Sequence, residues 1–294
     1  MLKWSQEFFT KHGFEDARLE AEVLLAYALH MDRFHLYVNF ERVLNTDDLA
    51  AYKELIKKRV AHYPSAYIVG QKAFMNLYFN VTKDVLIPRP ETEILVQTVM
   101  DNLKLINDES IRIADIGTGS GAIAISLIKS FRGAVVVDAV DISEAAIEVA
   151  KQNADKHQVS DKINFYVGDL LEPIADKKFT AIVSNPPYIP DKVIDTLQPE
   201  VAKYEPRLAL SGGADGLDFY RRLVKDAPDL ITDPGFLALE IGINQSKAVT
   251  KMIEDDGRLN SIEVIKDLAG IDRIIIAWKN KPEVINNEYY YEQD

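Results

Sequence analysis

Short apolar runs alternate with longer stretches of helical spacing from residue 111 to residue 278. Each run is short enough to be a strand, and strands that are apolar throughout are typical of sheets buried on both faces. We expect strands at 111–116, 135–140, 163–167, 179–184, 236–241, 262–266 and 273–278, and helices at 121–131, 143–157, 217–231 and 245–256. This alternation predicts an α/β fold, with a mainly parallel sheet that helices cover on both faces. The ligand of such a sheet binds at the carboxyl ends of the strands, near the topological switch point.

The fourth predicted strand ends in Asn185-Pro186-Pro187-Tyr188. Pro187 fixes its own φ and keeps Pro186 extended, and neither proline has an N–H group. The side-chain oxygen of Asn185 and the carbonyl oxygen of Pro186 therefore form two rigid acceptors beside the ring of Tyr188. Two acceptors and a ring face suit a planar NH2 group, either a carboxamide or the exocyclic amine of a base. The alternative is a turn that its prolines stiffen and that has no role in binding or catalysis.

A glycine-rich turn follows the first predicted strand, with the sequence Asp115-Ile116-Gly117-Thr118-Gly119-Ser120-Gly121. Glycines at alternate positions let the backbone bend tightly and let a ligand approach without contact to a Cβ atom. The helix that follows offers free N–H groups at its N-terminus. The G-x-G-x-G spacing differs from the G-x-G-x-x-G pattern of dinucleotide sites. An acid directly before the turn, Asp115, suits a ligand with an amine or cationic end better than a pyrophosphate.

The second and third predicted strands each end at an acidic residue. Asp141 stands where Rossmann-type sites place an acid that accepts from the ribose hydroxyls. Asp169 is placed to accept from an adenine amine, and Leu170 to pack on the face of the ring. An N-cap region for Asp141 and a turn for Asp169 are the alternatives. An amine, a ribose and an adenine together describe S-adenosylmethionine, which the sequence therefore predicts as the cofactor.

The first 65 residues have the spacing of a small helical bundle. Asp16 suits the N-cap of a helix at 17–29, and a second helix is expected from Thr46 or Asp47 to Val60. Such a bundle is either a scaffold or a module that docks a partner. The next residues are rich in aromatic and β-branched side chains, which predicts a hairpin with strands at 66–70 and 74–81 and Gly70 between them.

These patterns divide the chain into four parts. We expect a helical substrate-docking domain at 1–65, a β-hairpin linker at 66–87, a cofactor-binding domain at 88–280 and a mobile tail at 281–294. Residues 88–93 are expected to lead from the linker into the cofactor-binding domain, with a helix following at 94–100.

The charge and the composition narrow the class of function. The net charge is −12, with 34 basic and 46 acidic side chains, and proteins that bind duplex nucleic acid usually have a basic surface. The chain has no cysteine, and its five histidines form no pair at helical spacing, so we expect no metal site. A basic, then apolar N-terminal leader and an 18-residue apolar run are both lacking, so we expect a cytoplasmic protein without membrane contact.

Together these motifs resemble those of class I S-adenosylmethionine-dependent methyltransferases, and more narrowly those of bacterial release factor glutamine methyltransferases. The resemblance covers nearly the whole chain, and its segments are 86–93, 115–121, 185–188, 204–210, 212–217 and 267–273. It implies a Rossmann-like fold with a mainly parallel seven-stranded sheet, preceded by a helical bundle and a connecting hairpin. Leu170 departs from the family, whose members often have an aromatic residue there.

The resemblance also implies the reaction, in which a methyl group passes from S-adenosylmethionine to the side-chain amide nitrogen, N5, of a glutamine. That glutamine lies in the Gly-Gly-Gln loop of class 1 peptide chain release factors, so the reaction supports translation termination and leaves S-adenosyl-L-homocysteine. The implied cofactor-binding residues are Asp115, Gly117, Thr118, Gly119, Ser120, Gly121, Asp141, Asp169, Leu170 and Asn185. The implied catalytic residues are Asn185, Pro186 and Tyr188, and the implied substrate-binding residues are Asn185, Pro186, Pro187, Tyr188, Arg89 and Glu93.

We expect a monomer that binds release factors and does not bind nucleic acid stably. The main alternative is an adenine-N6 methyltransferase of DNA or RNA, because Asn-Pro-Pro-Tyr can also hold a flipped base.

Overall fold

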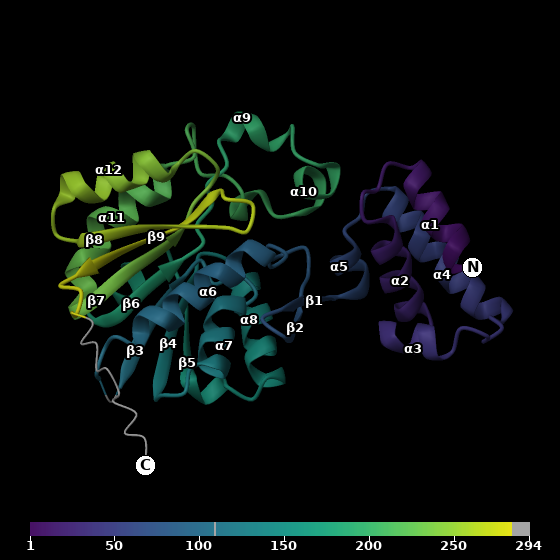
Figure 1. The fold of residues 1–294 in the computed structure, drawn as a ribbon, viewed down its shortest axis with the longest axis horizontal. Coiled ribbons are helices and arrows are strands. Elements are labelled where there is room, and N and C mark those ends of the chain that lie inside the picture. The colour runs from purple at the N-terminus through teal and green to yellow at the C-terminus, as the bar shows by residue number, and fades with distance from the viewer. Residues whose placement is uncertain (109, 284–294) are drawn as a thin grey trace, which may run out of the picture.

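The computed structural model describes residues 1–108 and 110–283 and has two parts (Figure 1). A bundle of helices, purple in the figure, contains the N-terminus, and a larger α/β body contains the rest. Of the tail predicted from residue 281, residues 284–294 lie outside the described part. None of the helices in the described ranges is long and apolar enough to cross a membrane.

The bundle consists of α1 (Leu2–Lys11), α2 (Ala17–Ala28), α3 (Arg33–Val38) and α4 (Thr46–Val60). Phe9, Leu24 and Tyr52 are fully buried at its centre. Asp16 occupies the N-cap of α2, as the sequence predicts, but its side chain makes no capping hydrogen bond. Helix α4 has a complete capping box, in which Asn45 and Asp48 exchange side-chain and backbone hydrogen bonds.

The linker between the two parts corrects one prediction. Residues 66–70, expected to be a strand, belong to the short helix α5 (Ser65–Val69) and its C-cap, Gly70. Gly70 has a φ of +76°, the left-handed conformation that ends a helix, so it does not form the hairpin turn. The hairpin pairs β1 (Gln71–Phe74) with β2 (Leu77–Asn80) through a turn at Met75-Asn76. The aromatic and β-branched composition of 66–69 suits a strand, but Pro64 and Gly70 bracket one helical turn.

Helix α6 (Pro90–Leu103) begins four residues before the predicted position at 94. Proline is common at the first helical position, because its φ suits a helix and its missing N–H is not needed there. The segment 88–93, which was expected to precede the helix, is therefore partly the first turn of α6. That turn brings Thr92 and Glu93 to the body of the protein.

In the described residues, seven strands form the sheet of the body. They are β3 (Ile111–Ile116), β4 (Val135–Asp141), β5 (Ile163–Val167), β6 (Phe179–Ser184), β7 (Ile231–Glu240), β8 (Asn260–Lys266) and β9 (Asp272–Lys279). Their order is β5-β4-β3-β6-β7-β9-β8, and β9 is antiparallel to both of its neighbours. The prediction of a mainly parallel sheet is confirmed. Strand β7 starts five residues earlier than predicted, because Pro234 and Gly235 interrupt its apolar pattern around an irregular register with β6.

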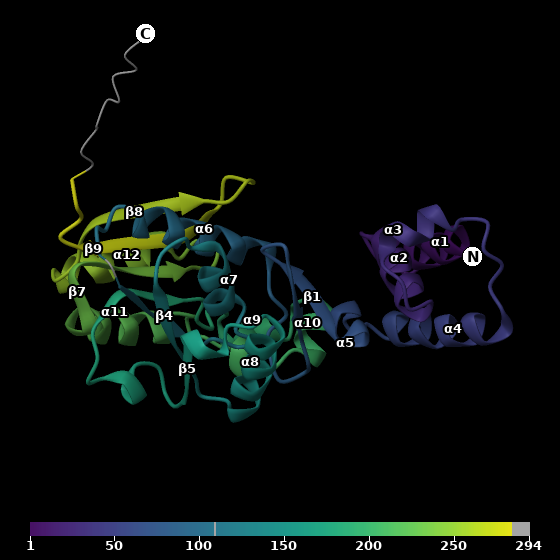
Figure 2. The same cartoon turned by 90° about the horizontal axis from the view of Figure 1, so that it is seen from below.

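Helices cover both faces of the sheet (Figures 1 and 2). One apolar core includes buried side chains of α6 and α7 (Ala122–Ser130), and α8 (Glu144–Lys156) adds Ala154 to it. The other core includes α11 (Asp218–Leu230) and α12 (Ser246–Asp256). The shorter elements are α9 (Asp191–Ile194), α10 (Pro199–Tyr204) and the 3-10 turns η1 (Ser160–Lys162), η2 (Glu172–Ile174) and η3 (Arg207–Ala209).

The register of the central strands positions the two main motifs. Ile116, at the end of β3, is paired with Ser184, at the end of β6, and the Ser184 hydroxyl donates to the Ile116 carbonyl at 2.7 Å. Gly117 and Asn185 therefore leave the sheet side by side. The chain continues from β3 to β4 on one side and from β6 to β7 on the other, so this pair of strands is the topological switch point.

Candidate functional site

A cavity of about 260 Å³ opens at the carboxyl ends of β3, β4, β5 and β6. Its lining includes eight of the residues predicted from the sequence, namely Gly117, Gly119, Asp141, Asp169, Leu170, Asn185, Pro186 and Pro187. The glycine turn, the two strand-end acids and the Asn-Pro-Pro segment are far apart in the sequence. The parallel sheet brings them to one cavity because all four strands end at the same edge.

Asp141 joins the glycine turn to the start of α8. One carboxylate oxygen accepts from the N–H of Gly119 at 2.9 Å, and the other accepts from the N–H of Ser143 at 2.9 Å. Burial raises the pKa of this carboxyl above its ordinary value. A carboxylate has about four acceptor positions, so Asp141 can still accept from two ligand hydroxyls.

Asp115 lies beneath the glycine turn, outside the described lining of the cavity. Its side chain is fully buried, and one oxygen accepts from the Thr118 hydroxyl at 2.6 Å and from the N–H of Ala124 at 3.2 Å. Its other oxygen has no hydrogen-bond partner among the described residues. Burial raises its pKa to about 7. In this position Asp115 supports the turn, and its unpaired oxygen is a spare acceptor next to it.

The glycines of the turn serve different purposes. A Cβ atom on Gly119 would meet nothing within 4 Å, so the protein itself leaves open space there, as a close ligand requires. A Cβ atom on Gly121 would lie 3.1 Å from the side chain of Ile125 and 3.2 Å from that of Ala150, so this glycine allows α7 and α8 to pack. An open glycine cradle, an acid for a ribose and a spare acceptor fit S-adenosylmethionine.

Ser120, predicted to bind the cofactor, is buried and outside the described lining. Its carbonyl accepts from the side-chain amide of Asn153 at 2.8 Å. The same amide exchanges hydrogen bonds with the backbone of Asn80 in the hairpin, at 2.7 and 3.0 Å. Asn153 therefore ties the hairpin to the glycine turn, and nothing in its helical surroundings indicates this role.

Asp169 is paired with Arg222 of α11 at 2.8 Å, which the sequence pattern did not indicate. Leu170 has a φ of +48° and lines the cavity. Two apolar residues without a sequence signal, Ile142 and Phe219, line it as well. Phe219 of α11 therefore brings an aromatic ring to a cavity in which position 170, often aromatic in similar proteins, is leucine.

Tyr188, the last residue of the Asn-Pro-Pro-Tyr motif, is outside the described lining. Its ring packs against the core under α11 and α12, and its hydroxyl lies 3.5 Å from a carboxylate oxygen of Glu240. Burial is the main reason that its pKa is raised. Tyr188 therefore supports the segment from the side of the core. The ring face that the sequence analysis expected beside the two acceptors is not part of the described lining.

The segment 212–217 braces the Asn-Pro-Pro-Tyr motif. The Gln245 side-chain amide donates to the carbonyls of Tyr188 and Gly216, at 3.0 and 3.1 Å. A Cβ atom on Gly212 would lie 2.8 Å from the Pro187 carbonyl oxygen, so a larger residue does not fit there. The backbone carbonyls of the motif are thus held in place by residues that follow it in the chain.

Arg89 and Glu93, which the sequence analysis predicted to bind the substrate, contact other segments of the protein. Arg89 donates to the carboxylate of Glu205 at 2.5 Å. Glu93 accepts from the N–H of Met75, in the turn of the hairpin, at 2.8 Å. Neither belongs to the described lining of the cavity, and both hold neighbouring segments against α6.

Glu240, at the end of β7, was missed by the sequence analysis. It is buried next to Thr92 and Tyr188, and burial raises its pKa to about 7 although the Thr92 hydroxyl and the charge of Arg273 lower it. Like Asp141 and Asp169, Glu240 is an acid at the end of an apolar strand. This pattern could have identified Glu240 from the sequence.

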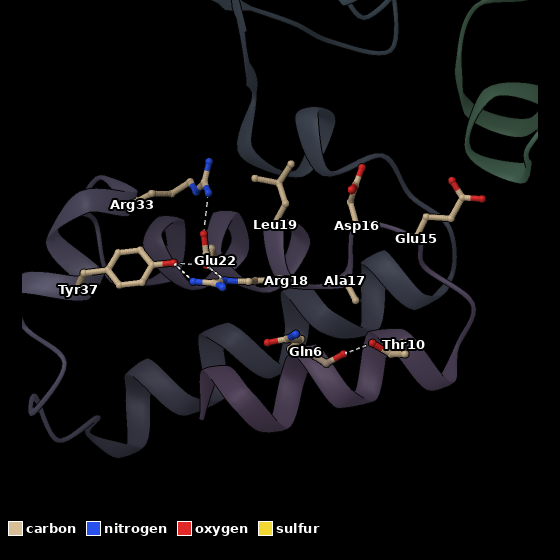
Figure 3. A pocket seen from close by; sticks show the side chains of 10 residues that line it. All are labelled: Gln6, Thr10, Glu15, Asp16, Ala17, Arg18, Leu19, Glu22, Arg33 and Tyr37. Carbon is tan, nitrogen blue, oxygen red and sulfur yellow. Dashed lines mark hydrogen bonds and ion pairs between the residues drawn. The ribbon is translucent and has the colours of Figure 1, made fainter. Parts of the chain in front are cut away.

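A second hollow of about 470 Å³ lies in the N-terminal bundle and contains none of the predicted site residues (Figure 3). It surrounds Glu22, whose side chain is 2% exposed and is paired with Arg18 at 2.8 Å and with Arg33 at 2.6 Å. Burial acts to raise the pKa of Glu22, but its hydrogen bonds with Tyr37 and the two arginines lower it to about 2. These contacts hold α3 against α2 within the bundle.

The strand order, the glycine turn between β3 and α7 and the acid at the end of β4 define a class I S-adenosylmethionine-dependent methyltransferase. Residues 1–70 match the family described as PrmC N-terminal domain, and residues 90–208 match the methyltransferase small domain. The chain is 42% identical to the release factor glutamine methyltransferase of Geobacter sulfurreducens, over 94% of each chain. It is 43% identical to that of Moorella thermoacetica, over 92% of this chain and 94% of the other.

The chain belongs to the release factor glutamine methyltransferase family, and the recognition made from its motifs is confirmed. It is a methyltransferase whose cofactor is S-adenosylmethionine. The fold is also similar to that of the hMettl16 catalytic domain, with a TM-score of 0.55 and 17% identity over 68% of this chain and 74% of that one. Similarity at this level of identity shows the fold alone.

Proposed function

We propose that Asn185 and Pro186 hold the side-chain amide of the glutamine in the Gly-Gly-Gln loop of class 1 release factors for methylation at N5. The observation that carries this proposal is the shared cavity, in which these two acceptors lie with Gly119, Asp141 and Asp169. The names of the relatives supply the substrate, a release factor glutamine. A primary carboxamide offers two N–H donors on one nitrogen, which matches the two acceptors.

S-adenosylmethionine, when bound, supplies an electrophilic methyl group on a sulfonium. The protein contributes position, because a carboxamide nitrogen is a poor nucleophile whose lone pair is delocalised into its carbonyl group. Holding the two reactants in the correct orientation can supply roughly 7–11 kcal/mol at best. The Asn185 side-chain oxygen and the Pro186 carbonyl each accept one N–H and stabilise the positive charge that develops on nitrogen. As the methyl–nitrogen bond forms, the methyl–sulfur bond would break and S-adenosylhomocysteine would be left as the thioether. The proton on nitrogen becomes acidic in this step, so it can leave late, to water, and no strong base is required.

The binding of the cofactor follows from the contacts of the cavity. Asp141 accepts from the ribose hydroxyls, and Asp169 accepts from the adenine amine while Arg222 neutralises its other oxygen. Ile142, Leu170 and Phe219 line the same cavity and provide apolar surface for the adenine ring. Gly119 leaves room for the amino acid end of the cofactor.

The helical bundle at 1–65 is the part we propose to dock the release factor, with the hairpin at 66–87 linking it to the catalytic domain at 88–280. Helix α3 and the residues after it support this role, because Phe34, Val38, Phe40 and Val43 are exposed there. The protein acts as a cytoplasmic monomer that does not bind nucleic acid stably, and the acidic excess of the chain supports the last point.

The test is the transfer of radiolabelled methyl groups from S-adenosylmethionine to a purified bacterial class 1 release factor. A release factor with the loop glutamine changed to alanine is the control, and duplex DNA and RNA are assayed in parallel. We expect label on the unaltered release factor alone. Label on nucleic acid and none on release factor would replace this proposal with an adenine methyltransferase.

A further inference from the structure

A chain of hydrogen bonds runs from the candidate substrate site into the interior. The side-chain nitrogen of Asn185 donates to the Thr92 hydroxyl at 3.1 Å, and that hydroxyl donates to the Glu240 carboxylate at 2.7 Å. Thr92 and Glu240 are buried, with 5% and 1% of their surfaces exposed. Asn185 directly follows β6, whereas Thr92 belongs to α6 and Glu240 to β7, so their contact depends on the packing of the body.

The direction of these bonds follows from the donors and acceptors. Above about pH 7, where Glu240 is ionised, its carboxylate only accepts, so the single hydroxyl proton of Thr92 points to Glu240. The Thr92 oxygen then faces Asn185 with a lone pair, and the NH2 group of Asn185 is the partner it can accept from. The carboxamide of Asn185 is therefore held in one of its two orientations, with its oxygen away from Thr92. The reversed orientation would present an NH2 group to the NH2 group of a glutamine.

We propose that Thr92 and Glu240 are positioning residues, which hold the Asn185 carboxamide with its oxygen toward the substrate amide. This inference rests on the proposed function, because it assumes that Asn185 accepts from the glutamine. Thr92 and Glu240 act through Asn185 and do not touch the reacting atoms. It also assigns a role to Thr92, within the first turn of α6, where the sequence motif at 86–93 had none.

The surroundings of Glu240 support this arrangement. Arg273, Glu91 and Tyr188 are the other charged or titratable groups that act on it, and its backbone carbonyl accepts from the Tyr220 hydroxyl at 3.0 Å. The Tyr188 hydroxyl lies 3.5 Å from the carboxylate oxygen that does not bind Thr92. The short bond from Thr92 is thus the main hydrogen bond of this buried carboxylate, and breaking it leaves an acceptor poorly satisfied.

The experiment compares Thr92→Val, which removes the hydroxyl at constant shape, with Thr92→Ser, which keeps it. Turnover and KM for release factor are measured on full-length protein, and the Kd of S-adenosylmethionine is measured by calorimetry. We expect kcat of Thr92→Val to fall on the order of tenfold, as for one lost hydrogen bond of this kind, with KM and Kd within about twofold. Thr92→Ser should restore most of the turnover, because its hydroxyl can make both bonds.

Wild-type turnover in Thr92→Val would overturn the inference, and so would equal losses in the Val and Ser variants, since they would show that shape matters and the hydroxyl does not. If Thr92→Val does not fold, Glu240→Gln replaces it. A glutamine amide can donate as well as accept, so the Thr92 hydroxyl is no longer directed, and kcat should fall several-fold. Unchanged turnover in Glu240→Gln would then overturn the inference.

Asn185→Ala separates this inference from the function on which it rests. An inactive Asn185→Ala together with a fully active Thr92→Val removes the positioning role and keeps Asn185 in the site. A fully active Asn185→Ala would exclude Asn185 from the site, and the role that the proposed function gives to Asn185 would then be wrong.

Discussion

The guanidinium group of Arg59 lies 2.9 Å from the carboxylate of Glu200, 141 positions further along the chain. Arg59 belongs to α4 of the N-terminal bundle, and Glu200 belongs to α10 of the body. The same guanidinium lies 3.0 Å from Glu20 and 4.2 Å from the centre of the Phe14 ring. Because α10 follows the Asn-Pro-Pro-Tyr motif after a short connection, this ion pair links the bundle to the neighbourhood of the site.

Arg59→Ala should destabilise the contact between the bundle and the body. The Arg59 side chain is 5% exposed, and its removal leaves two carboxylates without their cation. We expect the free energy of unfolding to fall by about 3 kcal/mol, the cost of breaking a buried ion pair from one side. Urea unfolding measures this loss, and limited proteolysis at 61–71 shows whether the link between the parts has loosened.

Lys57→Ala is the matched control on the same helix. Lys57 pairs with Glu54 at 2.6 Å, but both side chains are largely exposed. An exposed pair contributes about 0–1 kcal/mol, so this variant should unfold like the wild type. Equal stability of Arg59→Ala and Lys57→Ala would show that the Arg59 pair does not hold the two parts together.

Asp141→Ala should weaken the binding of S-adenosylmethionine. The variant loses the acceptors for the ribose and also the bonds that shape the turn at Gly119 and Ser143. We expect the Kd to rise on the order of 100-fold, as for hydrogen bonds to a charged group. Calorimetry measures it, with the exposed Asp161→Ala as control. An unaltered Kd would exclude Asp141 from the cofactor site.

Asn185→Ala should retain the cofactor and lose the reaction. Asn185 lines the cavity beside Pro186, and its substitution removes one of the two acceptors for the substrate amide. We expect kcat to fall on the order of 100-fold or more, as when one preorganised partner of the transition state is removed. The Kd of S-adenosylmethionine should stay within a few-fold. Turnover at the wild-type rate would contradict the role of Asn185.

Asp115 should make the stability of the ligand-free protein depend on pH. Its pKa rises from 3.8 to about 7 on burial, so the folded protein keeps a proton that the unfolded chain releases in this interval. The stability contributed by the protonated carboxyl is complete below about pH 4 and is lost as the pH rises through about 7.

Asp115→Asn has no such titration and keeps the shape of the side chain. The free energy of unfolding of the wild type, measured relative to this variant by urea titration, should therefore fall between about pH 4 and pH 7. A difference that stays constant over this range would show that Asp115 does not bind its proton more tightly in the folded protein.

Local pattern was sufficient for the strands and motifs that form the site. The runs at 111–116, 163–167 and 179–184 coincide with β3, β5 and β6, because a short apolar run between turn residues can be recognised from neighbouring residues alone. The same local reading was wrong at 66–70, where the side chains favour a strand. There a proline before the segment and a left-handed Gly70 after it determine a single turn of helix.

Tertiary structure alone decided which side chains meet. Thr92 contacts Asn185 and Glu240 across 93 and 148 positions, and Phe219 reaches the cavity from a helix of unremarkable pattern. Asp115 stands one residue from the turn in the sequence, yet it lies beneath the turn and outside the described lining. Periodicity reports the face on which a residue lies, whereas the partner of a buried donor or acceptor depends on how distant elements pack.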